Sequence, residues 1–290
     1  MSVFIGDDGG IRIAPETTYG TAGTVFVAQH PITGTPAQTN PLLDPPTLGS
    51  ANPTVRKYGV GSNDGEFVVA YDNSRAVIGA ILAAAGNLVA DDYTIGDGSA
   101  PDVASITSWV DFGGYAEQHT GRVLNSLRFE FQPDSPVTVT TSFLGQSVTQ
   151  PTPVSITPPD EADIVWESDI SAITIGGVAM CSLSGTIEVN FNVVGSDRHC
   201  LGAGVIKQPQ RTGRATITVN LNTELSDDSG ADSVAILAAY YAGTPLGEIV
   251  IGDFVLSNCY MTGDTPALGA GITQIPINAV AKELVITTVA

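Results

Sequence analysis

Hydrogen-bonding side chains alternate with apolar ones in two segments of this 290-residue chain, 181–193 and 215–225. The polar positions hold serine, threonine and asparagine together with Glu188 and Glu224, and neither segment contains lysine or arginine. Such groups accept hydrogen bonds and repel anions, but they cannot neutralise a phosphate backbone. The chemistry that they favour is a hydrated wall past which a polyanion moves without being held.

The alternation has a period of two, and this predicts the elements that carry those side chains. Successive side chains of a strand lie on opposite faces, so each segment is expected to be a strand with one buried and one wet face. The two strands are expected to pair as a long hairpin, 181–193 with 212–225. Their apolar face consists of Leu183, Ile187, Val189, Phe191, Ile217, Val219 and Leu221.

The chain offers little for catalysis or for a cofactor. His30, His119 and His199 form no i, i+4 pair, and the three cysteines are not at zinc spacing. There is no Walker loop, dinucleotide fingerprint or nucleophile elbow. Acidic clusters such as 91–102 do not match a calcium loop and are expected to be solvated turns. We therefore expect a protein that is not an enzyme and needs no metal and no cofactor.

The charge balance points in the same direction. Lys plus Arg total 11 against 30 Asp plus Glu, a net charge of −19. Such a chain repels nucleic acid, although plain acidic solubility would explain the charge equally well. The start of the chain has no signal-peptide pattern, and no apolar run approaches the ~18 residues of a membrane span. The odd number of cysteines suggests reduced thiols in a protein made in the cytoplasm.

The order of expected elements recurs along the chain. Residues 1–50 read as an extended arm with long loops, and 151–165 read as a proline-rich linker. A first module, 51–150, contains a strand at 66–72, a helix at 74–86, a strand at 105–112 and a hairpin of 123–132 with 137–144. A second module, 166–290, contains the long hairpin, a helix at 232–243 and a closing pair, 247–260 with 271–285. This order predicts two tandem related modules; a single large sandwich is the alternative.

Four groups of residues carry a resemblance to a known family. They are 15–21 (PETTYGT), 65–71 (GEFVVAY), 121–129 with 138–145, and 182–192 with 211–219. Together they span nearly the whole chain, and their sequences and order resemble those of the major tail proteins of siphophages, the phage tail tube family.

The resemblance implies a mainly β fold, sandwich-like or barrel-like, with short flanking helices. It implies a structural virion protein: a major tail tube subunit, made in the host cytoplasm, that assembles into stacked rings around a channel for DNA. The implied partners are further copies of the chain, the tape measure protein, and the tail terminator and distal tail proteins, with no membrane. Two fused tube domains favour a trimeric ring with pseudo-sixfold symmetry over a hexamer.

Two sets of residues are candidates for these roles. The candidates for facing the lumen are Glu66, Asp72, Glu130, Glu188, Asn190 and Glu224. The candidates for contacts between rings are Arg56, Lys57, Arg198, Lys207 and Arg211, in loops whose cations would pair with acidic turns of the adjacent ring. Solubilising hairpin tips is the alternative role for this second set.

Two other kinds of protein remain open at this point. One is another β-rich virion component, such as a baseplate, tail-terminator or capsid-decoration protein. The other is an extracellular adhesin or carbohydrate-binding sandwich, which would normally show a signal peptide and exposed aromatic residues, whereas Trp109 and Trp166 are the only tryptophans.

Overall fold

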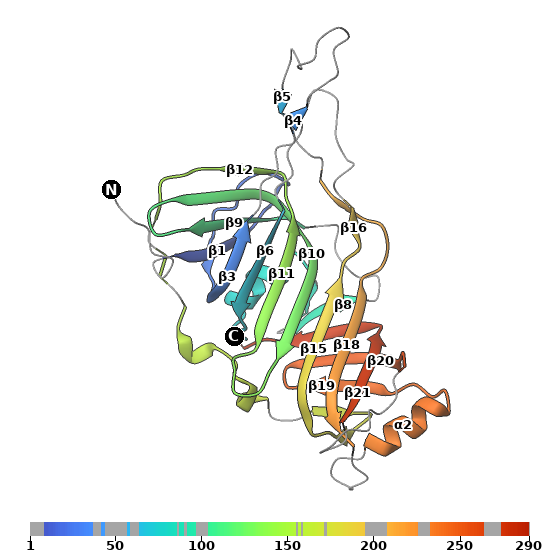
Figure 1. The fold of residues 1–290 in the computed structure, drawn as a ribbon. Coiled ribbons are helices and arrows are strands. Elements are labelled where there is room, and N and C mark those ends of the chain that lie inside the picture. Colours follow the sequence, from blue (N-terminus) through green and yellow to red (C-terminus); the bar gives the residue numbers. More distant parts are fainter. Residues whose placement is uncertain are drawn as a thin grey trace, which may run out of the picture.

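The fold is mainly β, as the sequence predicts, with two short α-helices among the described residues. The structure, a computed structural model, describes residues 9–36, 42–43, 57–58, 64–85, 87–89, 92–96, 104–154, 156–157, 159–170, 173–194, 208–225, 233–263 and 274–289. Figure 1 shows long neighbouring strands that form one broad sheet, with shorter strands packed behind it.

The broad sheet, called here the main sheet, is antiparallel throughout. Its strands, in spatial order, are β3 (Pro31–Pro36), β6 (Gly65–Ala70), β11 (Thr138–Leu144), β10 (Ala116–Phe131), β15 (Ser182–Asn190), β18 (Thr216–Glu224), β21 (Gln274–Ala281) and β20 (Phe254–Met261). The predicted hairpin of 181–193 with 212–225 is confirmed as β15–β18, and that of 123–132 with 137–144 as β10–β11.

Two smaller sheets lie on the apolar side. The first outer sheet contains β2 (Val27–Ala28), β1 (Gly10–Pro15), β9 (Ile106–Asp111), the first half of β10, and β12 (Ser147–Thr149). The second contains β14 (Val178–Ala179), β13 (Ile173–Ile175), β19 (Gly247–Ile251), the first half of β20, β22 (Glu283–Thr287), β8 (Asp92–Gly96) and β7 (Asn87–Val89). Strands β10 and β20 each pass from an outer sheet into the main sheet. The sheets do not close into a barrel within the described chain.

Two small ribbons extend from the hairpins of the main sheet. Strands β4 (Leu42–Leu43) and β5 (Lys57–Tyr58) pair between β3 and β6 in the chain. Strands β16 (Val193–Val194) and β17 (Gln210–Arg211) pair between β15 and β18. Figure 1 shows both ribbons beyond the same end of the main sheet.

The two helices occur where the sequence predicts them, but both are shorter. Helix α1 spans Val77–Leu82, three residues later than the expected start at Ser74, and is buried at every residue; Ala76 stands at its N-cap. Helix α2 spans Ser233–Tyr241. Gly243, the last residue of the helix expected at 232–243, has a φ of 69°, the left-handed conformation that ends a helix.

The strand pairings of the first half of the chain recur in the second half. Pairs β1–β2, β1–β9, β9–β10, β10–β12, β10–β11, β11–β6 and β6–β3 correspond in order to β13–β14, β13–β19, β19–β20, β20–β22, β20–β21, β21–β18 and β18–β15. Each set has one ribbon and one helix at the same place in the chain order. We call residues 10–149 the first unit and residues 173–287 the second unit.

The first unit differs from the expectation that residues 1–50 form an extended arm. Strand β1 pairs with β9 along its whole length, and β3 pairs with β6. Ile11 and Ile13 are buried in the core. The segment 151–165 contains a 3₁₀ turn, η2 (Glu161–Asp163), followed by η3 (Glu167–Asp169). Its end is tied to the first unit by a bridge between Ile164 and Asp72.

One core holds the two units together. The strands β10 and β15, from different units, pair along the main sheet from Ser126↔Asn190 to Phe131↔Gly185. Behind them the ring of Phe129 lies 4.6 Å, between centroids, from that of Phe254. Both side chains are buried, so the units share apolar packing as well as backbone hydrogen bonds.

Candidate functional site

The main sheet has one face that packs on the core and one that is polar. The second face carries polar side chains that are not buried. They include Glu66 in β6; Thr138, Thr140 and Ser142 in β11; Ser126, Arg128 and Glu130 in β10; Ser184, Thr186, Glu188 and Asn190 in β15; and Thr216, Thr218, Asn220, Asn222 and Glu224 in β18. Cross-strand register places these residues in rows, such as Thr140, Arg128, Glu188 and Thr218. The candidates Glu66, Glu130, Glu188, Asn190 and Glu224 therefore share one continuous surface, called here the polar face.

Asp72 does not belong to the polar face. The residue is 1 % exposed, and Oδ2 lies 3.2 Å from Nε2 of His30 while Oδ1 accepts a hydrogen bond from the backbone N–H of Ser74. A buried, hydrogen-bonded carboxylate holds neighbouring segments together and does not face water. The expectation that Asp72 faces a lumen was wrong.

Arg128 is a cation on this face that the sequence reasoning did not single out. Its side chain is 47 % exposed, its Nη2 lies 3.4 Å from Oε2 of Glu130, and Glu188 is its cross-strand neighbour. An exposed pair of this kind contributes little stability, about 0–1 kcal/mol, but it neutralises the charge locally. Among the described strand residues of the polar face, one arginine thus stands beside four glutamates. The alternation around Leu127 and Phe129 could have placed Arg128 here from sequence.

Of the five cations predicted to make contacts between rings, only Lys57 and Arg211 lie within the described residues. Arg56, Arg198 and Lys207 lie outside the described residues, and Lys57 belongs to β5. The guanidinium of Arg211, in β17, lies 4.7 Å from the centroid of the Phe191 ring, and burial lowers its pKa. Arg211 therefore packs on the core edge at the base of its ribbon, which differs from a free charge at a hairpin tip.

The main sheet ends in two open edges. Within the described chain, β3 pairs only with β6, and β20 has no strand beside it past Cys259 on the side away from β21. Each edge strand exposes a large apolar side chain, Ile32 at 49 % and Tyr260 at 54 %. Unpaired strand edges are templates for pairing with another chain, so these two edges are candidate assembly surfaces.

Glu16, in the sequence 15–21, organises the loop that follows β1. Its Oε2 accepts hydrogen bonds from Gly20 N–H at 2.9 Å and Ser105 Oγ at 2.7 Å. Its Oε1 accepts from Thr107 Oγ1 at 2.7 Å and from Gly121 N–H at 2.8 Å. One carboxylate thus ties the loop to β9 and β10. Residues 15–21 carry part of the family resemblance, but no sequence pattern predicted this role for Glu16.

The variant Glu16→Ala is expected to lose about 3 kcal/mol of unfolding free energy, because four donors lose a charged acceptor. Urea unfolding of the purified chain measures this loss. As a control, Glu161→Ala, at an exposed position, should change the unfolding free energy by less than about 0.5 kcal/mol. Equal effects of the two variants would show that the Glu16 contacts add nothing.

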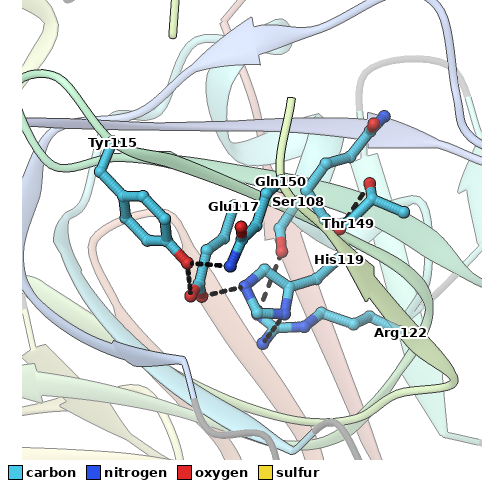
Figure 2. A network of polar contacts seen from close by, with 8 residues as sticks. Ser108, Tyr115, Glu117, His119, Arg122, Thr149 and Gln150 are labelled. Carbon is cyan, nitrogen blue, oxygen red and sulfur yellow. Dashed lines mark hydrogen bonds and ion pairs between the residues drawn. The ribbon is translucent and has the colours of Figure 1, made fainter. Parts of the chain in front are cut away.

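A buried network lies where β10 leaves the first outer sheet for the main sheet (Figure 2). Arg122 is fully buried between the rings of Phe67 and Phe143 and donates a hydrogen bond from Nη1 to Ser108 Oγ at 3.0 Å. Its Nη2 lies 3.2 Å from Nδ1 of His119. Burial lowers the pKa of Arg122 to about 9.

The network continues to the surface through His119. Its Nε2 lies 3.0 Å from Oε2 of Glu117, whose Oε1 accepts a hydrogen bond from the hydroxyl of Tyr115. The neutral ring that donates from Nε2 and accepts at Nδ1 fits both neighbours. Burial, followed by the positive charge of Arg122, lowers the pKa of His119 to about 3.

This pKa predicts an acid-sensitive fold. Folding lowers the pKa of His119 from 6.5 to about 3. The stabilisation of the fold by the neutral ring is therefore complete above about pH 6.5 and is lost as the pH falls toward 3. Between about pH 6.5 and pH 5 the wild-type chain should lose about 2 kcal/mol relative to His119→Gln. Urea unfolding at both pH values measures the difference. Parallel pH profiles of the two proteins would contradict the assignment.

Neither a metal-binding cluster nor a membrane-spanning helix is found in the described part of the chain. Histidine, cysteine and carboxylate side chains there form no group that could hold a metal ion. Of the two α-helices described, neither has the length and apolar character needed to cross a membrane.

The chain is thus a mainly β protein whose broad sheet has one polar face and two open edges. Among known families, the one described as phage tail tube protein matches residues 6–274. The chain belongs to this family and is a structural component of a phage tail, as the resemblance implied. No curated protein sequence matched the chain.

Proposed function

We propose that this chain is the major tail tube subunit of a phage with a long non-contractile tail. Copies join edge to edge through their main sheets, close into rings and stack into a tube, with the polar face turned toward the channel for DNA. The single observation that carries the proposal is the main sheet itself, polar on one face and open at β3 and β20. Family membership supports it.

The strand directions suit a ring. The eight strands of the main sheet alternate in direction from β3 to β20. The first and last strands therefore run in opposite directions, so β20 of one copy can pair with β3 of the next and keep the sheet antiparallel. A head-to-tail contact of this kind closes into a ring when the rotation between copies allows it.

The junction inside the chain supplies a template for this contact. By the recurring pairings, β20 corresponds to β10 and β3 corresponds to β15. The β10–β15 pairing within one chain is thus the counterpart of the proposed β20–β3 pairing between chains. Two related units per chain support a trimeric ring with pseudo-sixfold symmetry over a hexamer.

The polar face suits a channel wall. Four glutamates, with hydroxyls and amides between them, keep the surface hydrated and repel phosphate, while Arg128 is paired with Glu130. DNA would slide along such a wall without specific binding. The wall would first surround the tape measure protein, and the ends of the tube would meet the tail terminator and distal tail proteins.

The two ribbons are the proposed contacts between rings. Both leave the same end of the main sheet, at corresponding hairpins of the two units. Lys57 lies in one of them, and the loops around them contain Arg56, Arg198 and Lys207. Their charges would pair with acidic turns of the adjacent ring, with Arg211 fixing the base of its ribbon on Phe191.

A proline at the open edge tests the ring contact. The backbone N–H of Thr262 bonds to the carbonyl of Asn278 in β21, so the N–H of Met261, one residue earlier, points away from β21. Met261→Pro removes that outward N–H, and purified protein should then form no tubes by negative-stain electron microscopy. Thermal unfolding should show that the monomer still folds.

Thr262→Pro is the matched control. It removes the hydrogen bond to Asn278 within the chain, so it should lower the melting temperature more than Met261→Pro does. Wild-type protein should form filaments with a central hole. Wild-type protein that forms only isolated rings would contradict the proposed function. Tubes formed by Met261→Pro would contradict the proposed edge contact.

A further inference from the structure

Helix α2 exposes an apolar side. It contains no charged residue, and only Ser233, Ile236 and Leu237 are buried. Val234, Ala235, Ala238 and Tyr241 are exposed, Val234 at 43 % and Tyr241 at 69 %, and we call this set the α2 apolar side. A helix that is apolar all round is normally buried, so this side is expected to be covered in the assembled protein.

The corresponding helix of the first unit shows what a covered state looks like. All residues of α1 are buried. Gln29, which follows β2, donates from Nε2 to the carbonyl of Val77 at 3.2 Å. The hydroxyl of Tyr93, in β8, lies so close to Gly79 that a Cβ built there would be 2.8 Å away.

The segment that leads into helix α1 lies at the junction between the two units. In this segment, Asn73 Nδ2 donates to Oδ2 of Asp253, in the β19–β20 turn of the second unit, at 3.3 Å. The N–H of Arg75 bonds to the carbonyl of Val289, after β22, at 2.8 Å. Strand β8, which packs on α1, pairs with β22. The first unit therefore presents its helix region to the β19–β20 turn and β22 of the second unit.

From these contacts we infer that the α2 apolar side packs on the first unit of the next copy in the ring. The counterparts of the β19–β20 turn and β22 in the first unit are the β9–β10 turn, residues 112–115, and β12. If the junction between chains repeats the one within the chain, α2 meets these two elements.

The proposed partner surface has suitable chemistry. Tyr115 is 37 % exposed at the β9–β10 turn, and its ring lies 5.9 Å from that of Phe112. Its hydroxyl bonds to Glu117 and accepts from Gln150 Nε2, just past β12, which fixes the orientation of the ring (Figure 2). An aromatic platform with its polar end already satisfied suits contact with valine, alanine and tyrosine side chains. The occupant to which we commit is a second copy of this chain.

Cysteine cross-linking tests the contact and rests on the proposed function. The variant pairs Ala238→Cys with Tyr115→Cys in a chain that also carries Cys181→Ser and Cys200→Ser, so that the remaining native thiol is the buried Cys259. Assembled tubes treated with a short bismaleimide should give covalent dimers and trimers on a denaturing gel. Each single-cysteine variant is a control, because a head-to-tail contact brings position 238 of one copy to position 115 of another and needs both cysteines.

A second variant keeps the inference testable if cysteines disturb assembly. Val234→Asp with Tyr241→Asp should raise the protein concentration required for tubes at least about tenfold, which corresponds to about 1.4 kcal/mol, while monomer melting stays unchanged. Val154→Asp, at a valine that is 45 % exposed outside α2, is the matched control and should assemble normally.

The outcomes separate the two proposals. Tubes that give no more cross-linked product from the double-cysteine variant than from the single ones, or that tolerate Val234→Asp with Tyr241→Asp, would overturn the α2 contact and leave the tube function intact. Wild-type protein that forms neither rings nor tubes would overturn both.

Discussion

Lysine in place of Glu66, Glu130, Glu188 and Glu224 is expected to leave tails assembled but to stop most virions from releasing their DNA. These side chains lie on the polar face, so the proposed channel would change from a repelling wall to repeated rings of ammonium groups. Clustered lysines hold phosphates through counterion release, and this binding weakens steeply as salt rises. The measurement is the fraction of virions that release their genome after triggering, at about 50 and 200 mM salt.

Partial recovery at the higher salt would distinguish electrostatic retention of DNA from faulty assembly. The matched control makes the same charge change away from the polar face, with lysine at the exposed positions Glu161, Asp163, Glu167 and Glu248. Control virions should release DNA normally. Normal release by the polar-face variant would show that this face does not line the channel.

Truncation of Phe129 to alanine is expected to remove about 3–5 kcal/mol of unfolding free energy. The ring is fully buried and lies 5.7 Å from that of Tyr71 and 4.6 Å from that of Phe254, so the cavity opens where the two units meet. Because the core is shared, thermal unfolding should stay a single transition at a lower temperature. Phe112→Ala, at a partly exposed ring, should cost about 1 kcal/mol. Two separate transitions in the Phe129 variant would show that the units unfold independently.

The sequence predicted best the strands whose two faces differ. In β15 and β18 every second residue is apolar, and the structure buries Ile187, Val189, Ile217 and Val219 on one face. Strand β1 escaped prediction because it is short, begins with glycine, ends with proline and lies in a turn-rich region. Its burial comes from pairing with β9, almost a hundred residues away in the chain.

The candidate site was predictable only where local alternation decides it. Glu188, Asn190 and Glu224 follow directly from the strand period. Asp72 was misplaced because its partner His30 comes from a distant segment and fills the space that water would occupy. The open edges could not be read from sequence at all, since which strands remain unpaired depends on the whole order of the sheet.

Strands β10 and β20 each belong to an outer sheet at one end and to the main sheet at the other. An unbroken peptide backbone thus joins the two layers twice in every subunit. In the proposed tube, a mechanical load on the main sheet, such as friction from a moving genome, would pass to the outer sheets through covalent bonds instead of through sliding contacts. Such a tube would resist shear between the main sheet and the outer sheets.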